Sequence, residues 1–518
     1  MKKIAILIIC FVFCCAYPGF SVLADSGAVE MSLQNCLLRA LENNLDIAVA
    51  SFDPEISDVS IQQTREKYFP QLSLNYLNTN QTIPSTWGLE GNEYKSNYNY
   101  LGLNLSQAFV TGGTLNFRLF NRGSDTTRAY TNVNPSYFNE ISFEFKQPLL
   151  KGFGPKINNY DFYKAQNTKE LMVYGVRTTI QQKIYEIEEA YWNLVYQREN
   201  LKVQLLSLEQ NKTQLRKVRE AAKIGIKSAI DVLQMETEEA HWEDGILSAQ
   251  SLVEVYEDRL KNIMNIKTDG PYSAQAIIPT DRPVFKENMI PYEKALRISL
   301  ESRPEIASSL KKLENSRMDI KYSKNQLLPQ LDLNFRLWFP GQSGERLVYK
   351  DNNPLTGIIV DTIIGSRWDS FIESLNRKYQ NWEISLSLNV PLSDIFTRSN
   401  LITARLEKEK NELEMEKLKR EIENELIQVY KELENRTKRI RSTTRYRKME
   451  EKQLNAAMQR YELGLETSSQ WLLEYQRRLA TARVGEVKAI IDYNVALANL
   501  DKILGINMDS HDLQYRQF

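Results

Sequence analysis

The chain of 518 residues carries one pattern twice. Residues 31–75 align with residues 290–334 without a gap, and thirteen of the 45 aligned positions are identical. Two further blocks repeat in the same order: residues 141–149 with 384–392, and residues 186–233 with 425–472. Internal repetition means that both halves are built from the same elements in the same order. It therefore constrains the fold more than any single motif does.

The repeat and the flanking composition predict five segments. They are a signal peptide over residues 1–24, a first repeat over 25–269, a linker over 270–289, a second repeat over 290–506 and a C-terminal tail over 507–518. Lys2 and Lys3, a short apolar run and Ala24 are typical of a cleaved secretory signal. The mature chain then keeps Cys36 alone, which excludes an internal disulfide. We predict that the protein is exported.

Long helices are the first kind of element in each half. No proline occurs between Pro155 and Pro271 or after Pro391, and a proline inside a helix costs about 3 kcal/mol. Apolar residues recur at steps of three and four, at Ile180, Ile184, Ile187, Tyr191, Leu194, Leu201, Leu205 and Leu208, and again at Ile422, Leu426, Val429, Leu433 and Ile440. This heptad-like spacing predicts helices that pack along one another. Residues 156–223 as one helix would span about 100 Å.

Each long helix is interrupted at one matching point, near residue 225 in the first half and near 464 in the second. Glycine can end a helix in the left-handed conformation. Ser228 to Asp231 and Thr467 to Gln470 then resemble the capping boxes that begin a new helix. We therefore predict an opening helix in each half, followed by an antiparallel helical hairpin whose tip lies at Gly225 or Gly464.

Alternating strands are the second kind of element. Apolar and polar residues alternate over residues 71–82, 139–149, 330–339 and 381–391. Such strands form either a half-buried sheet or the wall of a membrane barrel, which must close because lipid cannot satisfy an open backbone edge. Four strands cannot close alone, so three chains would supply twelve. A further hairpin, 98–107 and 114–120, adds either an extracellular loop or two more wall strands.

Composition excludes several functions. The chain has 66 basic and 66 acidic residues, whereas a nucleic-acid-binding protein carries a basic excess. It has two histidines and no metal-binding, phosphate-binding or dinucleotide-binding motif. We predict no enzyme activity and no cofactor, and energy for any transport must come from partners.

The sequence resembles the TolC-like outer membrane factor family over essentially the whole mature chain. The tandem halves carry the resemblance, together with Leu328-Pro329-Gln330-Leu331 and the strand-ending Pro148-Leu149 and Pro391-Leu392. The resemblance implies a mixed α+β, mainly α fold. Long coiled-coil hairpins would form a periplasmic tunnel, and a β-barrel shared by a homotrimer would lie in outer membrane lipid of a diderm bacterium.

The same resemblance implies partners at the hairpin tips. A periplasmic adaptor protein of an inner-membrane pump would dock there, at Gly225, Ile226, Ser228, Gly464, Leu465 and Thr467. Family members often carry an acidic ring after the tip glycine, where this chain has Asp231. The matching residue of the second half is Gln470, and the next gate position holds Leu473. Asp231 is therefore a candidate tunnel gate, a capping residue, or both.

Two hypotheses for the function remain in competition. The leading one is a passive exit duct for an efflux pump or a type I secretion system. The alternative is a structural or adhesive surface protein, a coiled-coil stalk anchored by a barrel, which does not account for the duplicated tips. A periplasmic scaffold without membrane insertion leaves the strands unexplained. The sequence does not identify the transported substrate.

Overall fold

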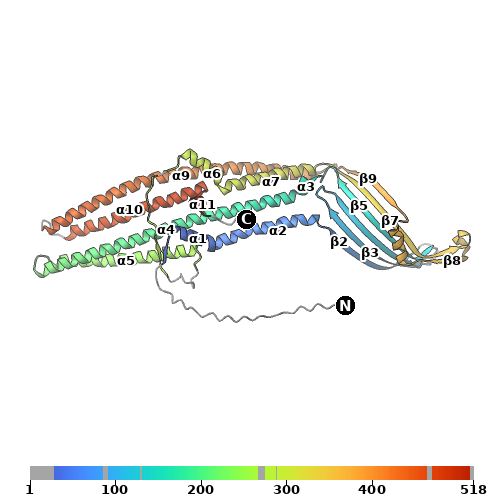
Figure 1. Cartoon of the computed structure of the whole chain (residues 1–518), viewed down its shortest axis with the longest axis horizontal. Coiled ribbons are helices and arrows are strands. Elements are labelled where there is room, and N and C mark those ends of the chain that lie inside the picture. The colour runs from blue at the N-terminus through green and yellow to red at the C-terminus, as the bar shows by residue number, and fades with distance from the viewer. Residues whose placement is uncertain are drawn as a thin grey trace, which may run out of the picture. The chain divides into compact units, whose positions relative to one another are not determined.

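The computed structural model of the chain describes residues 29–85, 91–128, 131–266, 275–287, 289–463 and 469–513 (Figure 1). The predicted signal peptide lies outside these residues, as do Gly464, Leu465 and Thr467. Within them, no helix is both long enough and apolar enough to cross a bilayer.

Most of the described chain is helical. The helices are α1 (Leu33–Asn43), α2 (Leu45–Arg65), α3 (Pro155–Asn158), α4 (Tyr160–Lys223), α5 (Ala229–Ile263), α6 (Tyr292–Ser302), α7 (Pro304–Gln326), α8 (Arg367–Leu375), α9 (Ile395–Glu462), α10 (Ser469–Leu504) and α11 (Asn507–Ser510). The strands are β1 (Val29–Met31), β2 (Gln71–Pro84), β3 (Glu93–Ala108), β4 (Thr114–Thr126), β5 (Val133–Pro148), β6 (Ile277–Pro279), β7 (Gln330–Tyr349), β8 (Ile359–Ile364) and β9 (Asn381–Asn389). The predicted mainly helical α+β class is confirmed.

The chain forms two compact units. The sheet unit contains residues 46–179 and 296–425, and the helical unit contains residues 29–45, 180–295 and 426–513. Helices α4 and α9 contribute residues to both units.

The sheet unit is organised by one antiparallel sheet. Its order is β2-β3-β4-β5-β7-β9, with β8 pairing the far end of β7 (Figure 1). The additional hairpin predicted as either a loop or wall strands forms β3 and β4, which extend the sheet between β2 and β5. Six strands of the chain therefore lie side by side in this sheet, and the hairpin is part of the sheet rather than a separate loop. β2 and β9 are its two edges.

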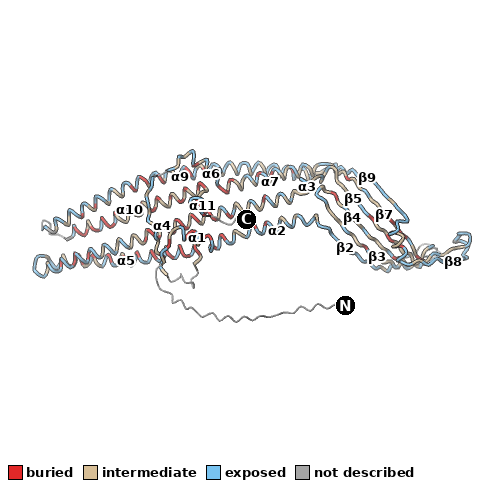
Figure 2. The backbone as a smooth tube through the Cα atoms, viewed as in Figure 1, coloured by how far each residue is buried: buried red, intermediate tan, exposed pale blue. Residues whose placement is uncertain are grey.

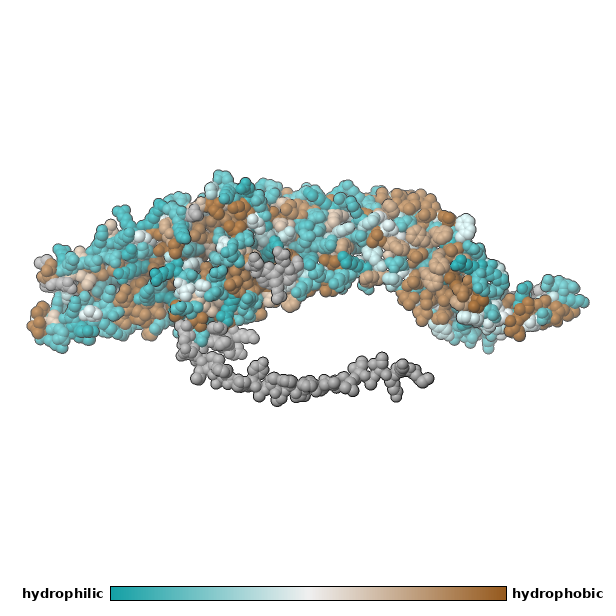
Figure 3. Space-filling view, viewed as in Figure 1, coloured by the Kyte–Doolittle hydropathy of each residue, from teal (hydrophilic) through white to brown (hydrophobic). Residues whose placement is uncertain are grey.

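The two faces of the sheet differ in polarity because the register aligns like residues across all six strands. One row reads Leu72, Leu105, Phe117, Phe143, Leu337 and Trp382. Side chains alternate between the faces along a strand, so the neighbouring positions face the other way. There, Asn116, Glu144, Arg336 and Glu383 form a polar row. Hydrophobic residues gather over the strands in Figure 3.

Four helices of the sheet unit lie in the order α2, α4, α7, α9. Lys169 of α4 pairs with Asp58 of α2 at 2.8 Å, and Lys311 of α7 with Glu170 of α4 at 2.9 Å. The amide of Asn411 on α9 then donates to Ser316 on α7 at 2.7 Å. The two outer helices, α2 and α9, are those that directly precede β2 and follow β9.

The helical unit contains the two hairpins, α4 with α5 and α9 with α10. The apolar stripes predicted from the sequence form its core. The buried residues include Ile180, Ile184, Ile187, Tyr191 and Leu194 of α4 and Leu426, Val429 and Leu433 of α9 (Figure 2). Leu205, further along the same α4 stripe, is half-exposed because no other part of the described chain covers it.

The internal repeat is visible as a repeated hydrogen bond. The hydroxyl of Tyr191 lies 3.1 Å from the Met31 carbonyl oxygen and 2.8 Å from the Asp281 carboxylate. The hydroxyl of the matching Tyr430 donates to the Ile290 carbonyl at 2.5 Å. Met31 and Ile290 are themselves aligned positions, each just before an opening helix. Each half thus anchors its opening helix with the same tyrosine.

Several features were not predicted. Each opening helix is broken at one aligned position, Asn44 between α1 and α2 and Arg303 between α6 and α7. β6 lies inside the predicted linker and pairs in parallel with β1. Cys36 is completely buried, and burial raises the pKa of its thiol to about 12.

Candidate functional site

The first hairpin tip is a tight turn between α4 and α5. Gly225 has a φ of +77°, in the left-handed region. The backbone amides of Gly225 and Ile226 donate to Ala222 and Ala221 at 3.0 and 2.9 Å, which satisfies the last carbonyls of α4. The predicted tip therefore lies at a chain reversal whose backbone requires glycine.

Asp231 caps the second helix of this hairpin. The Ser228 side chain accepts from the Asp231 backbone amide at 3.2 Å, and the Asp231 carboxylate accepts from the Ser228 backbone amide at 3.1 Å. These reciprocal bonds form the capping box that the sequence predicted. The capping role of Asp231 is thus visible in the geometry, and its gating role stays a prediction.

The other two gate candidates lie at the start of α10 and differ from each other. Gln470 is exposed and lines an open pocket between α5 and α10, together with Ile230, Leu233 and Trp471. Leu473 is buried against Leu215, Val218 and Met235. Its packing in this apolar cluster gives Leu473 a role in joining the hairpins.

An ion pair between a buried carboxylate and a half-exposed arginine, which sequence reasoning missed, joins the hairpins below the tips. The carboxylate of Glu238 on α5 is 2 % exposed, and the Nε of Arg477 on α10 donates to its two oxygens at 2.9 and 3.0 Å. Removing the arginine would leave the buried carboxylate unpaired, which is destabilising. No spacing marked either residue, because each is one of many charged residues on a long helix.

Apolar side chains are concentrated on the surface around the tips. Ile226 is 70 % exposed, and Ile224, Ile230, Leu233 and Leu463 are also exposed. Exposed apolar side chains are poorly solvated by water, so their concentration at the tips is compatible with the predicted docking there.

The polar face of the sheet is concave. The hollow is lined by twelve polar or charged side chains: Ser73, Asn75, Asn104, Asn116, Arg118, Ser142, Glu144, Lys146, Asn334, Arg336, Glu383 and Ser385. Two ion pairs neutralise part of the charge, Lys146 with Asp332 at 2.9 Å and Arg336 with Glu140 at 2.8 Å. This face suits water and dissolved solutes.

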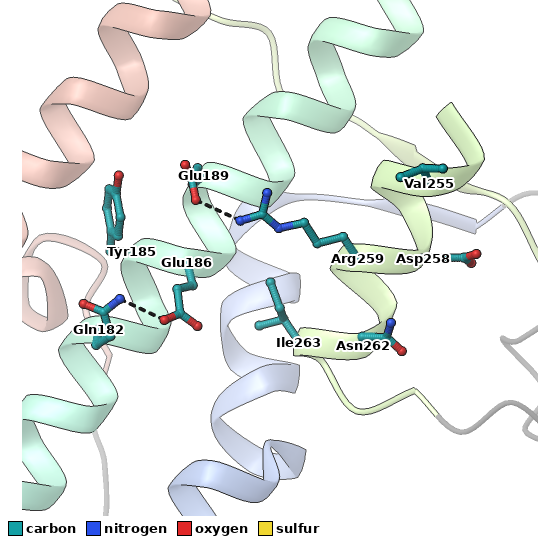
Figure 4. A pocket seen from close by; sticks show the side chains of 9 residues that line it. All are labelled: Gln182, Tyr185, Glu186, Glu189, Val255, Asp258, Arg259, Asn262 and Ile263. Carbon is teal, nitrogen blue, oxygen red and sulfur yellow. Dashed lines mark hydrogen bonds and ion pairs between the residues drawn. The ribbon is translucent and has the colours of Figure 1, made fainter. Parts of the chain in front are cut away.

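Other clusters of titratable groups are held together in the helical unit. A groove between α4 and α5 carries Glu189 bonded to Arg259 at 3.1 Å and Gln182 bonded to Glu186 at 2.8 Å (Figure 4). At the end of the chain, His511 bonds to Glu188, which raises the pKa of the histidine. Burial, assisted by Glu188, raises the pKa of Asp501 to about 6. In the described ranges, no group of three or more His, Cys, Asp and Glu residues could hold a metal ion.

Comparison with known proteins places this geometry in context. Residues 295–506, most of the second repeat, match the family model described as outer membrane efflux protein. No curated protein matches the sequence.

Solved structures resemble the whole fold at low sequence identity. A membrane protein from Pseudomonas aeruginosa is 15 % identical with a TM-score of 0.63, and the match covers 93 % of this chain and 95 % of that one. The outer membrane protein VceC from Vibrio cholerae is 13 % identical with a TM-score of 0.62, and the match covers 91 % of this chain and 96 % of that one. The open-state MtrE outer membrane channel from Neisseria gonorrhoeae is 16 % identical with a TM-score of 0.60, and the match covers 91 % of this chain and 88 % of that one.

The fold is therefore one that solved outer membrane channels share. The family model matches residues 295–506, so the second repeat is similar to the outer membrane efflux protein family. The resemblance to TolC-like outer membrane factors is confirmed.

The left-handed backbone at Gly225 generates a prediction with a matched control. Gly225→Ala should cost about 1–2 kcal/mol, since a side chain disfavours this backbone conformation. Gly485→Ala, in the middle of α10 with open space around it, should instead stabilise by up to about 1 kcal/mol. Hydrogen exchange at the Ile226 amide measures the difference. Equal exchange rates in both variants would contradict the predicted strain.

Proposed function

We propose that this protein is the outer membrane exit duct of a tripartite efflux pump or a type I secretion system, working as a homotrimer. Substrates would pass from a periplasmic adaptor complex through a helical tunnel and a barrel to the exterior. The observation that carries the proposal is a sheet with one apolar and one polar face and two open edges, in the same chain as two tipped helical hairpins.

The faces of the sheet support a place in the membrane wall. Leu72, Leu74, Trp382, Leu386 and Leu388 are exposed on the apolar face. So much outward apolar surface is unfavourable in water and favourable against lipid. The concave polar face would then line the passage.

The edges support closure by further copies of the chain. Every pairing from β2 to β9 is antiparallel, so the β9 edge of one copy can pair antiparallel with the β2 edge of the next. Each edge strand is mostly exposed (Figure 2). Three copies would bring eighteen strands, six from each, and bacterial outer membrane barrels have an even number.

The outer helices carry a matching pair of apolar stripes. Val49, Phe52, Ile56 and Val59 of α2 are exposed at steps of three and four, and so are Ile402, Leu406 and Leu413 of α9 at steps of four and seven. This is the spacing by which helices pack side by side. Because α2 leads into β2 and α9 follows β9, both contacts would form at one boundary between copies.

The tips support docking of an adaptor. Their apolar surface, around Ile226 and Ile224, has no covering residue in the described chain. Gly225 and Ser228 fix the turn that presents it. We place the contact of the second tip at Gly464, Leu465 and Thr467, by analogy between the repeats. The inner-membrane pump would supply the energy, and a structural or adhesive stalk would need neither a passage nor docking tips.

The candidate gate can be tested by conductance in planar bilayers. Three Asp231 carboxylates near the trimer axis would favour cations, so Asp231→Asn should reduce cation preference, measured as the reversal potential across a salt gradient. Ser228→Ala is the control, because it removes the capping hydroxyl at a cost of about 1 kcal/mol but keeps the charge. Unchanged selectivity with reduced stability in Asp231→Asn would leave Asp231 as a cap alone. If no open form of the protein conducts ions, the proposal that it is an exit duct is wrong.

Docking can be tested by a charge in the apolar surface of the tip. Ile226→Asp should abolish export in cells, because a buried carboxylate without a partner opposes association. The purified variant should still form trimers and conduct. Ile226→Leu, which keeps the apolar surface, should export normally. Normal export by Ile226→Asp would exclude this surface from docking.

A further inference from the structure

Helix α8 lies on the apolar face of the sheet. The Ser374 hydroxyl donates to the Asn139 carbonyl at 3.1 Å, and a Cβ atom added to Gly341 would lie 2.1 Å from the Ser370 carbonyl oxygen. Gly341 pairs with Asn139, and both stand an even number of residues from Phe143 and Leu337. Alternation along the strands therefore puts this contact on the same face as the apolar row.

The amphipathicity of α8 is inverted relative to a helix that covers a protein core. Ser370 and Ser374, which touch the sheet, are 0 % and 1 % exposed. Trp368 and Leu375, on the opposite side, are 65 % and 55 % exposed. At 100° per residue, Phe371 and Ile372 fall on the same outer arc as these two. A helix bathed in water would place its polar side outward.

The orientation of α8 is fixed at both ends. Ser366 and Asp369 form a capping box, with the Ser366 backbone amide donating to the Asp369 carboxylate at 2.6 Å. The Glu373 carboxylate accepts from the Gln342 backbone amide at 3.2 Å. Gly341 leaves room for this close approach. The outward apolar arc is thus a built feature rather than the result of a loosely attached helix.

Two cations lie at the ends of α8, with Arg367 as its first residue and Arg377 just past its last. Arg367 stacks on the Tyr137 ring with its guanidinium carbon 5.5 Å from the ring centroid, and Arg377 does the same on Phe339 at 5.5 Å. Both arginines are exposed, and neither forms an ion pair with a described residue, although the Arg367 guanidinium also donates to the Asn99 side chain. Arginine beside an apolar surface complements the phosphate groups that lie above lipid acyl chains.

We propose that α8 is an interfacial membrane helix, whose outer arc of Trp368, Phe371 and Leu375 lies among the acyl chains bordering the sheet, with Arg367 and Arg377 at the level of the lipid phosphates. Its partner is a phospholipid bilayer. The proposal rests on the proposed function, since it takes the apolar face of the sheet as the face toward lipid. A helix of this kind fixes the depth of the barrel wall in the membrane.

Spin labels on the full chain in vesicles test this location. Cysteines are introduced singly at Leu375, at Leu386 on the apolar face of β9 and at Ser385 on its polar face, in a Cys36→Ala background. Vesicles of phosphatidylethanolamine and phosphatidylglycerol are used. Oxygen partitions into acyl chains and a nickel chelate stays in water, so their collision rates report the surroundings of each label.

We expect the ratio of oxygen to nickel collisions to be several-fold higher at Leu375 and Leu386 than at Ser385. A water-exposed Leu375 label beside a lipid-exposed Leu386 label would overturn the proposal and leave the duct intact. A Leu375 label shielded from both reagents would mean that a neighbouring copy covers α8, which also overturns it. A Leu386 label outside lipid would contradict the proposed function itself.

Discussion

Two unpaired backbone edges, on β2 and β9, determine what the rest of this chain must do. In lipid an unpaired edge is unfavourable because no water replaces the missing hydrogen bonds, so this sheet, with six strands side by side between its two edges, would need further chains to close it. The same constraint accounts for the outer helices. α2 and α9 expose apolar stripes that a monomer would not keep, and each adjoins an edge strand. In the proposed trimer, the sheet and the outer helices would therefore contact the same neighbouring copy.

The two repeats share one structural anchor but differ at their tips and in their sheet strands. Tyr191 and Tyr430 anchor the opening helices in the same way. At the tips the halves diverge: the first has the carboxylate of Asp231 where the second has the amide of Gln470. In the proposed trimer a charged ring would then come from one repeat only. The sheet diverges as well, since the β3–β4 hairpin belongs to the first half and α8 and β8 to the second.

The sequence predicts the repeated features well and the local ones poorly. Heptad steps predict the buried faces of α4 and α9, and strict alternation predicts β2, β5, β7 and β9, because both patterns reflect burial by long regular elements. The hairpin of β3 and β4 was predicted as strands, but its place stayed open, because a pattern along one hairpin does not encode which strands it pairs with. The pairing of Glu238 with Arg477 and the burial of Leu473 depend on contacts between distant helices, which spacing along one helix does not encode. The sequence of α8 has the pattern of an ordinary amphipathic helix, which does not show that its polar side contacts the sheet.

Disulfide cross-linking between the edge strands tests the central claim most directly. Asn75→Cys on β2 is combined in turn with a cysteine at Asn381, Glu383, Ser385 or Ser387 on β9, all on the polar face of the sheet. Closure by three copies predicts that at least one pair forms a disulfide between chains, with covalent dimers and trimers and nothing larger. No cross-link at any pair, or a ladder that continues past three chains, would contradict the shared barrel.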